Sequence, residues 1–526
     1  MSFDISTWDG LAKLGVYSVN GRSFSTPALF PVVHPTRQEI EANRIGKEFG
    51  FQQFITSTYL LSKKYSQDDL PAIHELLNYD GVIMMDSGAY QLMVYGDVEL
   101  DMRKTMEIQK KVGTDIGVIM DHPIGYDVPF EEAERRVQTT IERVHESIEF
   151  MGEDVNWTLP IQGGKYVELI DRYLDAVLTE EVLSRYKFFA LGSVVQVMIR
   201  QDYLSMAKMI IATRKRLPVK YPLHLFGAGH PSMFALATYL GCDTFDSAAY
   251  SLMARDGRYM TTHGTYQIDN IQTLPCTCPV CSSTDVKSLR KMEKDIRRRK
   301  LAEHNLWVSA QEIKLIKLAI SRGELRNLVI DRMTAVPGLG IATKYALEQI
   351  EKTDLFRSSI PVSRPFAMRI SSIYDVNRPE IVIIRKYIER HLRELSPNSS
   401  EVILLFLNWK KSIYKKVPDE HLRFMGEEIH RTFIASPFFG LIPFGLGETY
   451  PLSQFWSDLI EDELPNTLNE HLSFLLDRGI TKVQAYIQQE WSDGQLEYLR
   501  DNFSLTEIRT DKIITKLREQ FGTQDL

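Results

Sequence analysis

The segment Val82-Ile-Met-Met-Asp-Ser-Gly88 carries the pattern that decides the fold. Four apolar residues make a run of strand length, and an aspartate, a serine and a glycine follow it directly. Unbroken apolar runs are typical of strands that are buried on both faces, as in parallel sheets. The pattern recurs along the chain, and the candidate strands are residues 28–33, 51–58, 82–87, 116–121, 156–162, 187–193, 222–227 and 244–247.

The segments between these runs have the periodicity of amphipathic helices, for example at 130–151 and 168–184. Alternation of strands and helices indicates an α/β fold with a parallel sheet. Eight such strands in succession favour a closed (β/α)8 TIM barrel. A doubly wound open sheet is the structural alternative, but no Gly-x-Gly-x-x-Gly motif follows an early strand, which weakens it.

Composition places the chain among ordinary globular proteins and limits its partners. Of 526 residues, 44% are hydrophobic and 25% are charged, and the formal net charge is −7. Bulk charge therefore does not indicate a nucleic-acid partner, and any such partner would need a local basic patch. No apolar run reaches the ~18 residues of a membrane span, and residues 1–10 lack the pattern of a signal peptide. We expect a cytoplasmic protein without a membrane segment.

Three of the candidate strands end in an aspartate, at Asp86, Asp121 and Asp246. The carboxyl ends of barrel strands form the mouth, where the chemistry of such enzymes takes place. A single aspartate there is more often a loop cap, but a buried carboxylate is costly unless it is hydrogen-bonded or used. Three aspartates at one rim are better explained as a functional site.

Asp86 and Asp246 belong to the third and eighth strands, so we expect them to face each other across the mouth. Two carboxylates that flank a glycosidic bond are the recurrent arrangement for sugar transfer. One attacks C1′ and forms a covalent intermediate, while the other moves protons. The remaining candidates would contact a purine-like base, and they are Ser87, Tyr90, Asp121, Gln162, Gly192 and Ser193.

Three histidines also lie at strand ends, namely His122, His224 and His230. An isolated histidine in such a position is more often structural than catalytic. None of the three is therefore assigned to the chemistry.

A cysteine cluster follows the barrel, in Pro275-Cys-Thr-Cys-Pro-Val-Cys281, while Cys242 stands alone. Three thiolates this close can reach one tetrahedral zinc ion, and His304 is the best candidate for the fourth ligand. A chance cluster in a loop is the alternative. Four protein ligands leave no open position for water, so a zinc ion in residues 275–305 would be structural. The predicted ligands are Cys276, Cys278, Cys281 and His304.

A strongly helical and basic stretch follows, from Val286 to about Ala319. Charged residues in such a run usually form a solvent-exposed helix face. Beside a zinc site and a polar barrel mouth, contact with nucleic-acid phosphates becomes the better interpretation. The residues predicted to make it are Arg297, Arg298, Arg299 and Lys300.

A second domain is predicted after a linker that contains Pro361 and Pro365. Its apolar runs, such as 381–384 and 402–407, alternate with helix-like segments such as 419–432 and 496–521. We expect residues 1–355 to form the catalytic domain, and residues 366–526 to form a smaller α+β domain.

Several long motifs resemble those of the tRNA-guanine transglycosylases, most closely the archaeal, archaeosine-forming branch. They occur in the family's order, cover roughly residues 10–350 and continue more weakly through 377–380 and 437–451. The barrel motifs are residues 86–97 (DSGAYQLMVYGD), 190–193 (ALGS), 224–231 (HLFGAGHP) and 241–250 (GCDTFDSAAY), and the metal motifs are 275–281 (PCTCPVC) and 304–306 (HNL).

The resemblance implies a pentosyltransferase that exchanges guanine at position 15 of the tRNA D-arm for 7-cyano-7-deazaguanine (preQ0), in archaeosine biosynthesis, without ATP or a redox cofactor. By motif match Asp246 would be the nucleophile and Asp86 the general acid/base, although some accounts of the archaeal branch give the attack to the position of Asp86. The positions that would read the base are Asp121, Gln162, Gly192 and Ser193, and those that would hold one structural zinc are Cys276, Cys278, Cys281 and His304.

The chain departs from the family pattern in two places. Gly192-Ser193 stands where many members have Gly-Gly, which affects the detail of the base contacts. Archaeal members usually carry a C-terminal PUA RNA-binding domain, and residues 496–526 resemble a helical segment instead. We therefore expect either a separate PUA-domain partner or tRNA binding without one. The resemblance also implies a homodimer.

Two other functions remain open from the sequence. A paralogue that inserts a 7-deazaguanine into DNA would use the same barrel, zinc and aspartates. A non-catalytic partner subunit that only binds tRNA would not need Asp86, Asp121 and Asp246 together, and all three are present. An unrelated barrel hydrolase with a structural zinc would not explain the length of the motif match.

Overall fold

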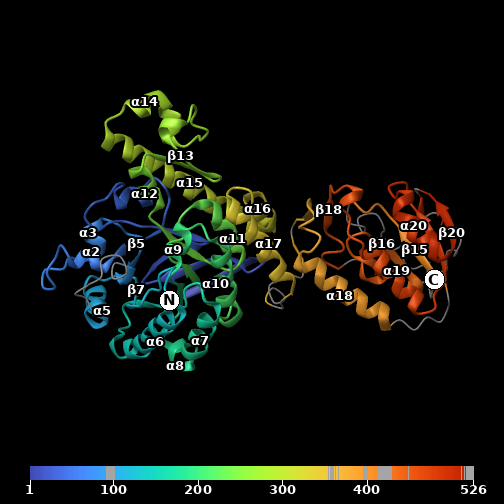
Figure 1. The fold of residues 1–526 in the computed structure, drawn as a ribbon, viewed down its shortest axis with the longest axis horizontal. Coiled ribbons are helices and arrows are strands. Elements are labelled where there is room, and N and C mark those ends of the chain that lie inside the picture. Colours follow the sequence, from blue (N-terminus) through green and yellow to red (C-terminus); the bar gives the residue numbers. More distant parts are fainter. Residues whose placement is uncertain are drawn as a thin grey trace. The chain divides into compact units, whose positions relative to one another are not determined.

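The computed structural model describes residues 1–90, 101–352, 355, 360–361, 363–364, 366–394, 401–410, 429–447, 449–510, 512–513 and 516. The chain divides into two compact units (Figure 1). The first contains residues 1–321 and 325–349, and the second contains residues 322–324 and 350–526.

Eight parallel strands form the centre of the first unit, in the order β4-β11-β10-β9-β8-β7-β6-β5. The outermost strands of this order meet where Val33 N donates to Ile55 O at 2.8 Å, so the sheet closes into a barrel. The predicted (β/α)8 barrel is confirmed. The strands are β4 (Ala28–Pro31), β5 (Gln53–Ser57), β6 (Val82–Asp86), β7 (Ile116–Val118), β8 (Asn156–Ile161), β9 (Phe188–Leu191), β10 (Leu223–Leu225) and β11 (Thr244–Ser247).

Helices surround this barrel (Figure 1). Several begin at side chains that cap their free N–H groups; Asp101 accepts from Lys104 N at 2.7 Å, for example. The helices are α1 (Ala42–Lys47), α2 (Thr58–Ser62), α3 (Ile73–Leu77), α5 (Met102–Lys111), α6 (Phe130–Ser147), α7 (Val167–Val177), α8 (Glu180–Arg185), α9 (Val194–Ile199), α10 (Tyr203–Arg216), α11 (Phe234–Tyr239) and α12 (Ala249–Arg255).

A three-stranded antiparallel sheet precedes the barrel and packs on its amino-terminal end. Its strands are β1 (Ser2–Asp9), β2 (Ala12–Val19) and β3 (Arg22–Thr26). The ring of Tyr17 lies 5.2 Å from that of Phe188, and Phe24 lies 5.2 Å from Phe30. This sheet and the first residues of the barrel strands share one hydrophobic core, which leaves the carboxyl ends of the strands as the open end.

The insertion that carries the cysteine segment lies between the last barrel strand and the final helices of the first unit. A hairpin of β12 (Arg258–Thr261) and β13 (Gly264–Gln267) leads to the cysteine segment. Asn305 holds the hairpin, because its Oδ1 accepts from Met260 N at 2.9 Å. The helices are α13 (Pro279–Ser283), α14 (Val286–Lys291), α15 (Lys294–Arg322), α16 (Leu325–Arg332) and α17 (Pro337–Lys352).

The second unit contains a five-stranded sheet in the order β17-β16-β15-β19-β20, in which only β17 is antiparallel to its neighbour. Two short strands, β14 (Met368–Ile370) and β18 (Phe455–Ser457), pair separately. The sheet strands are β15 (Glu401–Phe406), β16 (Thr432–Ser436), β17 (Gly440–Pro443), β19 (Lys482–Ile487) and β20 (Ser504–Arg509), and the helices are α18 (Pro379–Glu394), α19 (Thr467–Asp477) and α20 (Asp493–Asn502).

One expectation for this unit was wrong. Residues 496–521 were expected to be helical, but α20 ends at Asn502 and residues 504–509 form the edge strand β20. Leu505 and Ile508 pack against the core, so tertiary contacts with β19 decide the conformation of a short segment whose own pattern is ambiguous. Of the helix expected at 419–432, residues 419–428 lie outside the described residues, and Thr432 begins β16.

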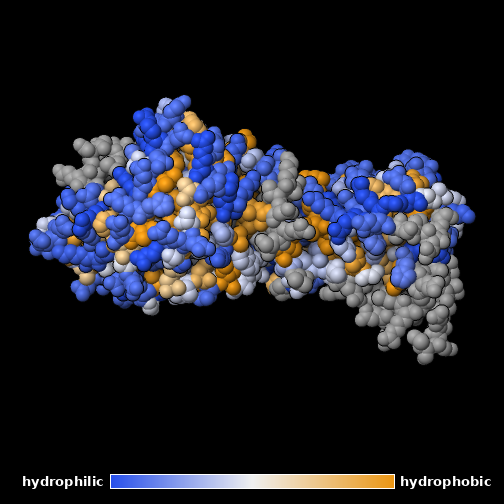
Figure 2. Space-filling view, turned by 90° about the horizontal axis from the view of Figure 1, so that it is seen from below, coloured by the Kyte–Doolittle hydropathy of each residue, from blue (hydrophilic) through white to orange (hydrophobic). Residues whose placement is uncertain are grey.

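The surface drawn in Figure 2 is predominantly hydrophilic over both units, with apolar residues scattered among the polar ones. Within the described part of the chain, no helix combines the length and the apolar character needed to cross a membrane.

Candidate functional site

The three predicted carboxylates gather at the open end of the barrel. Asp86 is the last residue of β6, Asp246 lies in the last half of β11, and Asp121 follows β7. Asp121 and Asp246 are close enough for their charges to raise the pKa of Asp86. Three aspartates that are far apart in the sequence therefore form one electrostatically coupled site.

Asp86 is tuned to exchange a proton near neutral pH. Burial is the main reason that the pKa of Asp86 rises to about 7; the N–H of Gly88, 3.0 Å from Oδ1, opposes this rise, and the charges of Asp121 and Asp246 add to it. A carboxyl group that is about half protonated at pH 7 can serve as acid and as base in one reaction cycle. The geometry thus favours Asp86 for proton transfer.

We expect Asp86→Asn to be more stable than the wild type at pH 8, and to lose that advantage towards pH 4. An unfolded aspartate titrates near ~3.9, below the raised pKa of about 7 in the folded protein. The folded state then binds the proton more tightly, so stability falls as the pH rises between these values. The amide mimics the neutral carboxyl and escapes this loss.

Thermal unfolding at both pH values measures the effect, with Asp80→Asn as the control. Asp80 is exposed and lies just ahead of the same strand, so its replacement should shift the melting temperature little at either pH. Equal stabilisation by Asp86→Asn at pH 8 and pH 4 would contradict the raised pKa.

Asp246 is held through one of its two oxygens. Gly227 N donates to Oδ1 at 2.7 Å, and His224 Nε2 lies 3.1 Å from the same atom. Gly227 has a φ of +61°, and a side chain there would collide with Val195, so glycine is needed to present this N–H. Both contacts use Oδ1, and no described residue hydrogen-bonds to Oδ2, so the carboxylate is fixed in a way that leaves Oδ2 for a reacting atom.

His224 is a functional candidate that the sequence analysis missed. Its ring is fully buried, Nδ1 lies 2.9 Å from Thr244 Oγ1, and the ring packs edge-on against Phe30 and Phe226. Since the Thr244 hydroxyl can donate to Nδ1, the Nε2–H is available to donate to Asp246. The sequence does show a histidine between two leucines of a buried strand. In the structure it pairs with Thr244, two positions before Asp246.

A one-way chain of hydrogen bonds orients the base-reading candidates. The backbone N–H of Ile124 donates to Ser193 Oγ at 2.8 Å, and the Ser193 hydroxyl donates to Gln162 Oε1 at 2.5 Å. Gln162 Nε2 then donates to Asp121 Oδ2. Because an ionised carboxylate can only accept, Gln162 turns its N–H towards Asp121 and its Oε1 towards the Ser193 hydroxyl, which sets the direction of these hydrogen bonds.

The backbone just after β9 has the conformation that these hydrogen bonds require. Ser193 has a φ of +59°, in the left-handed region where glycine is usual, and the two hydrogen bonds of its hydroxyl hold it there. A side chain at Gly192 would collide with the amide of Gln162. Burial raises the pKa of Asp121 to about 6, and the Gln162 hydrogen bond works against this rise.

The other predicted base contacts lie in the same region. Ser87 is buried, and its Oγ accepts from Ala89 N at 3.3 Å. Tyr90 is partly buried and is the last described residue before the gap at 91–100. The part of the 86–97 motif beyond Tyr90 therefore lies outside the described residues.

The predicted metal ligands converge on one point. The ligand atoms of Cys276, Cys278, Cys281 and His304 all lie within 4.8 Å of one another. His304 Nδ1 is 3.3 Å from Cys281 Sγ, while its Nε2 is 2.8 Å from Met260 O. A carbonyl on the far nitrogen orients a metal-ligating imidazole, so this set fits a tetrahedral ion and leaves no position open.

The basic residues of α15 are only partly available to a partner. Arg298 pairs with Glu39 at 2.9 Å, and Lys300 pairs with Glu303 at 3.2 Å. Arg297 donates to the carbonyl of Arg290, and Arg299 is exposed. Arg298 and Lys300 thus already have acidic partners within the chain.

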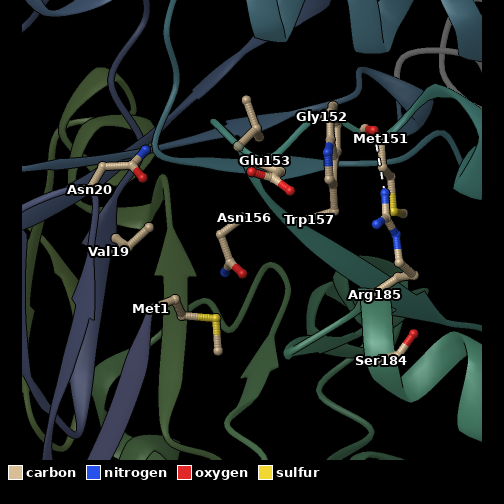
Figure 3. A pocket seen from close by; sticks show the side chains of 11 residues that line it. Met1, Val19, Asn20, Met151, Gly152, Glu153, Asn156, Trp157, Ser184 and Arg185 are labelled. Atoms are coloured by element: carbon tan, nitrogen blue, oxygen red, sulfur yellow. Dashed lines mark hydrogen bonds between the residues drawn. The ribbon is translucent and has the colours of Figure 1, made fainter.

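A pocket of about 240 Å³ lies away from this site, at the amino-terminal ends of the strands (Figure 3). Asn156, the first residue of β8, lines it together with Asn20, Met151 and Arg185. In barrels this end serves stability rather than chemistry. The pocket therefore contributes nothing to the candidate site.

At the open end, the carboxyl group of Asp86 has a pKa near neutral, and the carboxylate of Asp246 is held by Oδ1, while no described residue hydrogen-bonds to its Oδ2. This fold and site define a barrel enzyme that acts at a glycosidic bond. Comparison with known proteins agrees, because the family model described as Queuine tRNA-ribosyltransferase matches residues 9–338, and the chain belongs to that family.

Curated relatives extend the match beyond the barrel. The tRNA-guanine(15) transglycosylase of Methanocaldococcus jannaschii is 36% identical over 471 residues, which are 86% of this chain and 68% of that protein. The tRNA-guanine(15) transglycosylase of Pyrococcus furiosus is 34% identical over 507 residues, or 95% of this chain and 77% of that protein. The resemblance inferred from the motifs is confirmed.

Proposed function

We propose that this protein is a tRNA-guanine(15) transglycosylase that exchanges guanine at position 15 of tRNA for preQ0, in archaeosine biosynthesis. The observation that carries the proposal is the carboxylate pair: Asp86 with a pKa of about 7, and Asp246 with both of its hydrogen bonds on Oδ1. Relatives of that name match over most of the chain and support the choice of substrate.

In the proposed reaction, Asp246 Oδ2 attacks C1′ of the target ribose. The C1′–N9 bond breaks, and Asp86 gives its proton to the departing guanine, which leaves the ribose joined to Asp246 as an ester. The incoming base then loses its N9 proton to Asp86 and attacks C1′, which releases the Asp246 carboxylate. Two inversions give net retention, as in retaining glycosidases.

The alternative assignment exchanges the two roles. Asp86 is less suited to attack, because a carboxyl group with a pKa of about 7 is largely protonated in mildly acidic solution. Asp246 is better suited, because donors on Oδ1 stabilise the ester carbonyl that this atom becomes after attack.

Asp121 would accept from the N1–H and the amino group of guanine, with Gln162, Gly192 and Ser193 shaping the same edge. This edge is identical in guanine and in 7-deazaguanines, so one pocket can hold the leaving and the incoming base in turn. The pocket walls would include Ser87 and Tyr90.

The metal site would hold one zinc ion with a structural role. Its ligands would be Cys276, Cys278, Cys281 and His304, a set that zinc favours and that allows no bound water. The ion would fix the β12–β13 hairpin to α15, and with it the basic residues Arg297, Arg298, Arg299 and Lys300, which would face tRNA phosphates.

Further parts of the proposal concern organisation. Residues 1–355 would form the catalytic domain and residues 366–526 a C-terminal domain. The protein would act in the cytoplasm as a homodimer, and a separate PUA-domain protein would assist tRNA binding where the chain alone binds weakly.

Release of labelled guanine tests this function. Purified protein is mixed with preQ0 and either a tRNA or a DNA duplex whose guanines are radiolabelled. Release from tRNA alone supports the proposal, whereas release from DNA would assign the chain to the DNA-modifying alternative. No release from either, with tRNA still bound, would favour the non-catalytic partner subunit.

His224→Phe should lower kcat about 10²-fold, because one donor to the Asp246 carboxylate is lost while the aromatic packing is kept. His224→Gln keeps an N–H near the position of Nε2 and should recover much of the rate. The KM for tRNA should stay near the wild-type value in both variants. Equal loss in both variants would point to a packing role instead.

A further inference from the structure

A tyrosine flanked by two cations lies at the barrel mouth, outside the site described above. Lys165 Nζ lies 4.4 Å from the centre of the Tyr126 ring, and Arg200 Cζ lies 4.9 Å from it. Tyr126 and Lys165 are partly exposed, and Arg200 is exposed. We call these three residues the rim cluster.

The rim cluster is built by the loops that follow three successive strands. Tyr126 follows β7, Lys165 follows β8, and Arg200 follows α9, which itself follows β9. Since the carboxyl ends of parallel barrel strands share one face, all three residues belong to the mouth. The same loops supply Asp121, Gln162 and Ser193, so the rim cluster borders the base-reading residues.

Internal contacts hold the rim cluster in place. The Tyr126 hydroxyl donates to Asp202 Oδ2 at 2.8 Å, and Arg200 pairs with Asp127. The neighbouring Tyr166 hydroxyl donates to Val128 O at 2.7 Å, which ties the loop after β8 to the loop after β7. The ring of Tyr126 therefore has a fixed position from which to orient the two cations.

Lys165 differs from Arg200 beside it and from Arg298 and Lys300 on α15. Arg200, Arg298 and Lys300 each pair with a carboxylate, whereas the described residues provide Lys165 with aromatic neighbours only, the rings of Tyr126 and Tyr166. An ammonium group that is positioned by rings and not neutralised by an acid is suited to an external anion. On a chain with a net charge of −7, such local positive charge is what a polyanion would require.

We propose that Lys165, aligned by Tyr126 and assisted by Arg200, binds a backbone phosphate of the tRNA strand next to the nucleotide whose base enters the pocket. This inference rests on the proposed function for the identity of the polyanion. Lys165 lies three positions after Gln162, so a strand that delivers a base to Gln162 and Asp121 must pass this rim. The contact fixes the strand while the base is replaced.

Equilibrium binding of fluorescently labelled tRNA transcript tests the proposal, with Lys165→Ala, Lys165→Glu and Arg200→Ala compared with the wild type. We expect Lys165→Ala to weaken binding about fivefold to tenfold near 0.15 M salt, and to reduce the slope of log Kd against log salt by about 1, as for one lost phosphate contact. Lys165→Glu should weaken binding further. In exchange assays the KM for tRNA should rise, while the KM for preQ0 and kcat at saturating tRNA remain near wild type.

Lys220→Ala is the matched control. Lys220 Nζ also lies over a tyrosine ring, 5.2 Å from that of Tyr221, but it precedes β10 at the opposite end of the barrel. Its replacement should leave the Kd for tRNA and the salt slope unchanged. Melting temperatures verify that each variant is folded.

Unchanged tRNA affinity and salt slope in Lys165→Ala would overturn the proposal, as would an equal loss in Lys220→Ala. Failure of the proposed function is a different result: the wild type would bind tRNA but release no guanine. The tRNA-binding measurements would still show whether Lys165 contacts tRNA. A larger loss of affinity for duplex DNA than for tRNA in Lys165→Ala would also overturn it.

Discussion

Asp246→Ala should abolish base exchange, with a loss of roughly 10⁴-fold or more in the single-turnover rate, as expected when a covalent nucleophile is removed. The alanine cannot form the ester. The fold should survive, because the hydrogen bonds of this side chain within the described residues go to His224 and Gly227 at an open barrel end. Guanine exchange measures the loss of rate, covalent trapping of tRNA on denaturing gels measures the loss of the ester, and thermal unfolding measures whether the fold survives.

Asp86→Ala provides the comparison that separates the two aspartates. It should slow exchange while still permitting some ester to form at Asp246, and a better leaving group than guanine should recover part of its rate. Trapped ester in Asp246→Ala, together with its absence in Asp86→Ala, would show that the two roles are reversed.

Cys278→Ser should remove most of the bound metal and destabilise the first unit by several kcal/mol. A closed structural zinc site contributes about 10 kcal/mol or more of apparent binding free energy, much of which is folding free energy. Loss of one thiolate leaves three ligands, so the cysteine segment is held less firmly to His304 on α15. Metal content by mass spectrometry and thermal unfolding are the measurements.

Cys242→Ser is the matched control for that substitution. Cys242 is buried outside the cluster, so its replacement should leave the metal content at the wild-type level. A chelator should lower the melting temperature of the wild type and of Cys242→Ser, but change that of Cys278→Ser little. Full metal occupancy in Cys278→Ser would reject the ligand set.

The barrel could be predicted because each of its strands is buried on both faces. Residues 82–85 and 188–191, for example, are apolar throughout and cannot be mistaken for a half-exposed strand. The sheet of β1–β3 was not predicted, because strands such as 2–9 alternate between exposed and buried residues and carry polar side chains on one face. The edge strand β20 was taken for helix for a related reason, since only Leu505 and Ile508 contact the core.

Site residues were predictable where the chemistry is visible in residue type and position. Aspartates at strand ends indicate a carboxylate site, and closely spaced cysteines indicate metal ligands. The roles of His224 and Lys165 could not be assigned from residue type and position, because they depend on neighbours that the fold supplies. His224 meets Asp246 through the register between β10 and β11, and Lys165 meets Tyr126 across two loops. The catalytic roles and the domain boundaries stay predictions.

The one-way chain from Ile124 through Ser193 and Gln162 to Asp121 has a consequence for re-engineering. Its direction is set at the Asp121 end, because an ionised carboxylate can only accept, so Gln162 faces it with the amide N–H. In Asp121→Asn the new amide would turn its oxygen towards the Gln162 N–H, and its NH2 group would replace the carboxylate oxygen that is left for the base. This single exchange would convert the edge from an acceptor to a donor, so a change of base preference can begin with the residue that touches the base.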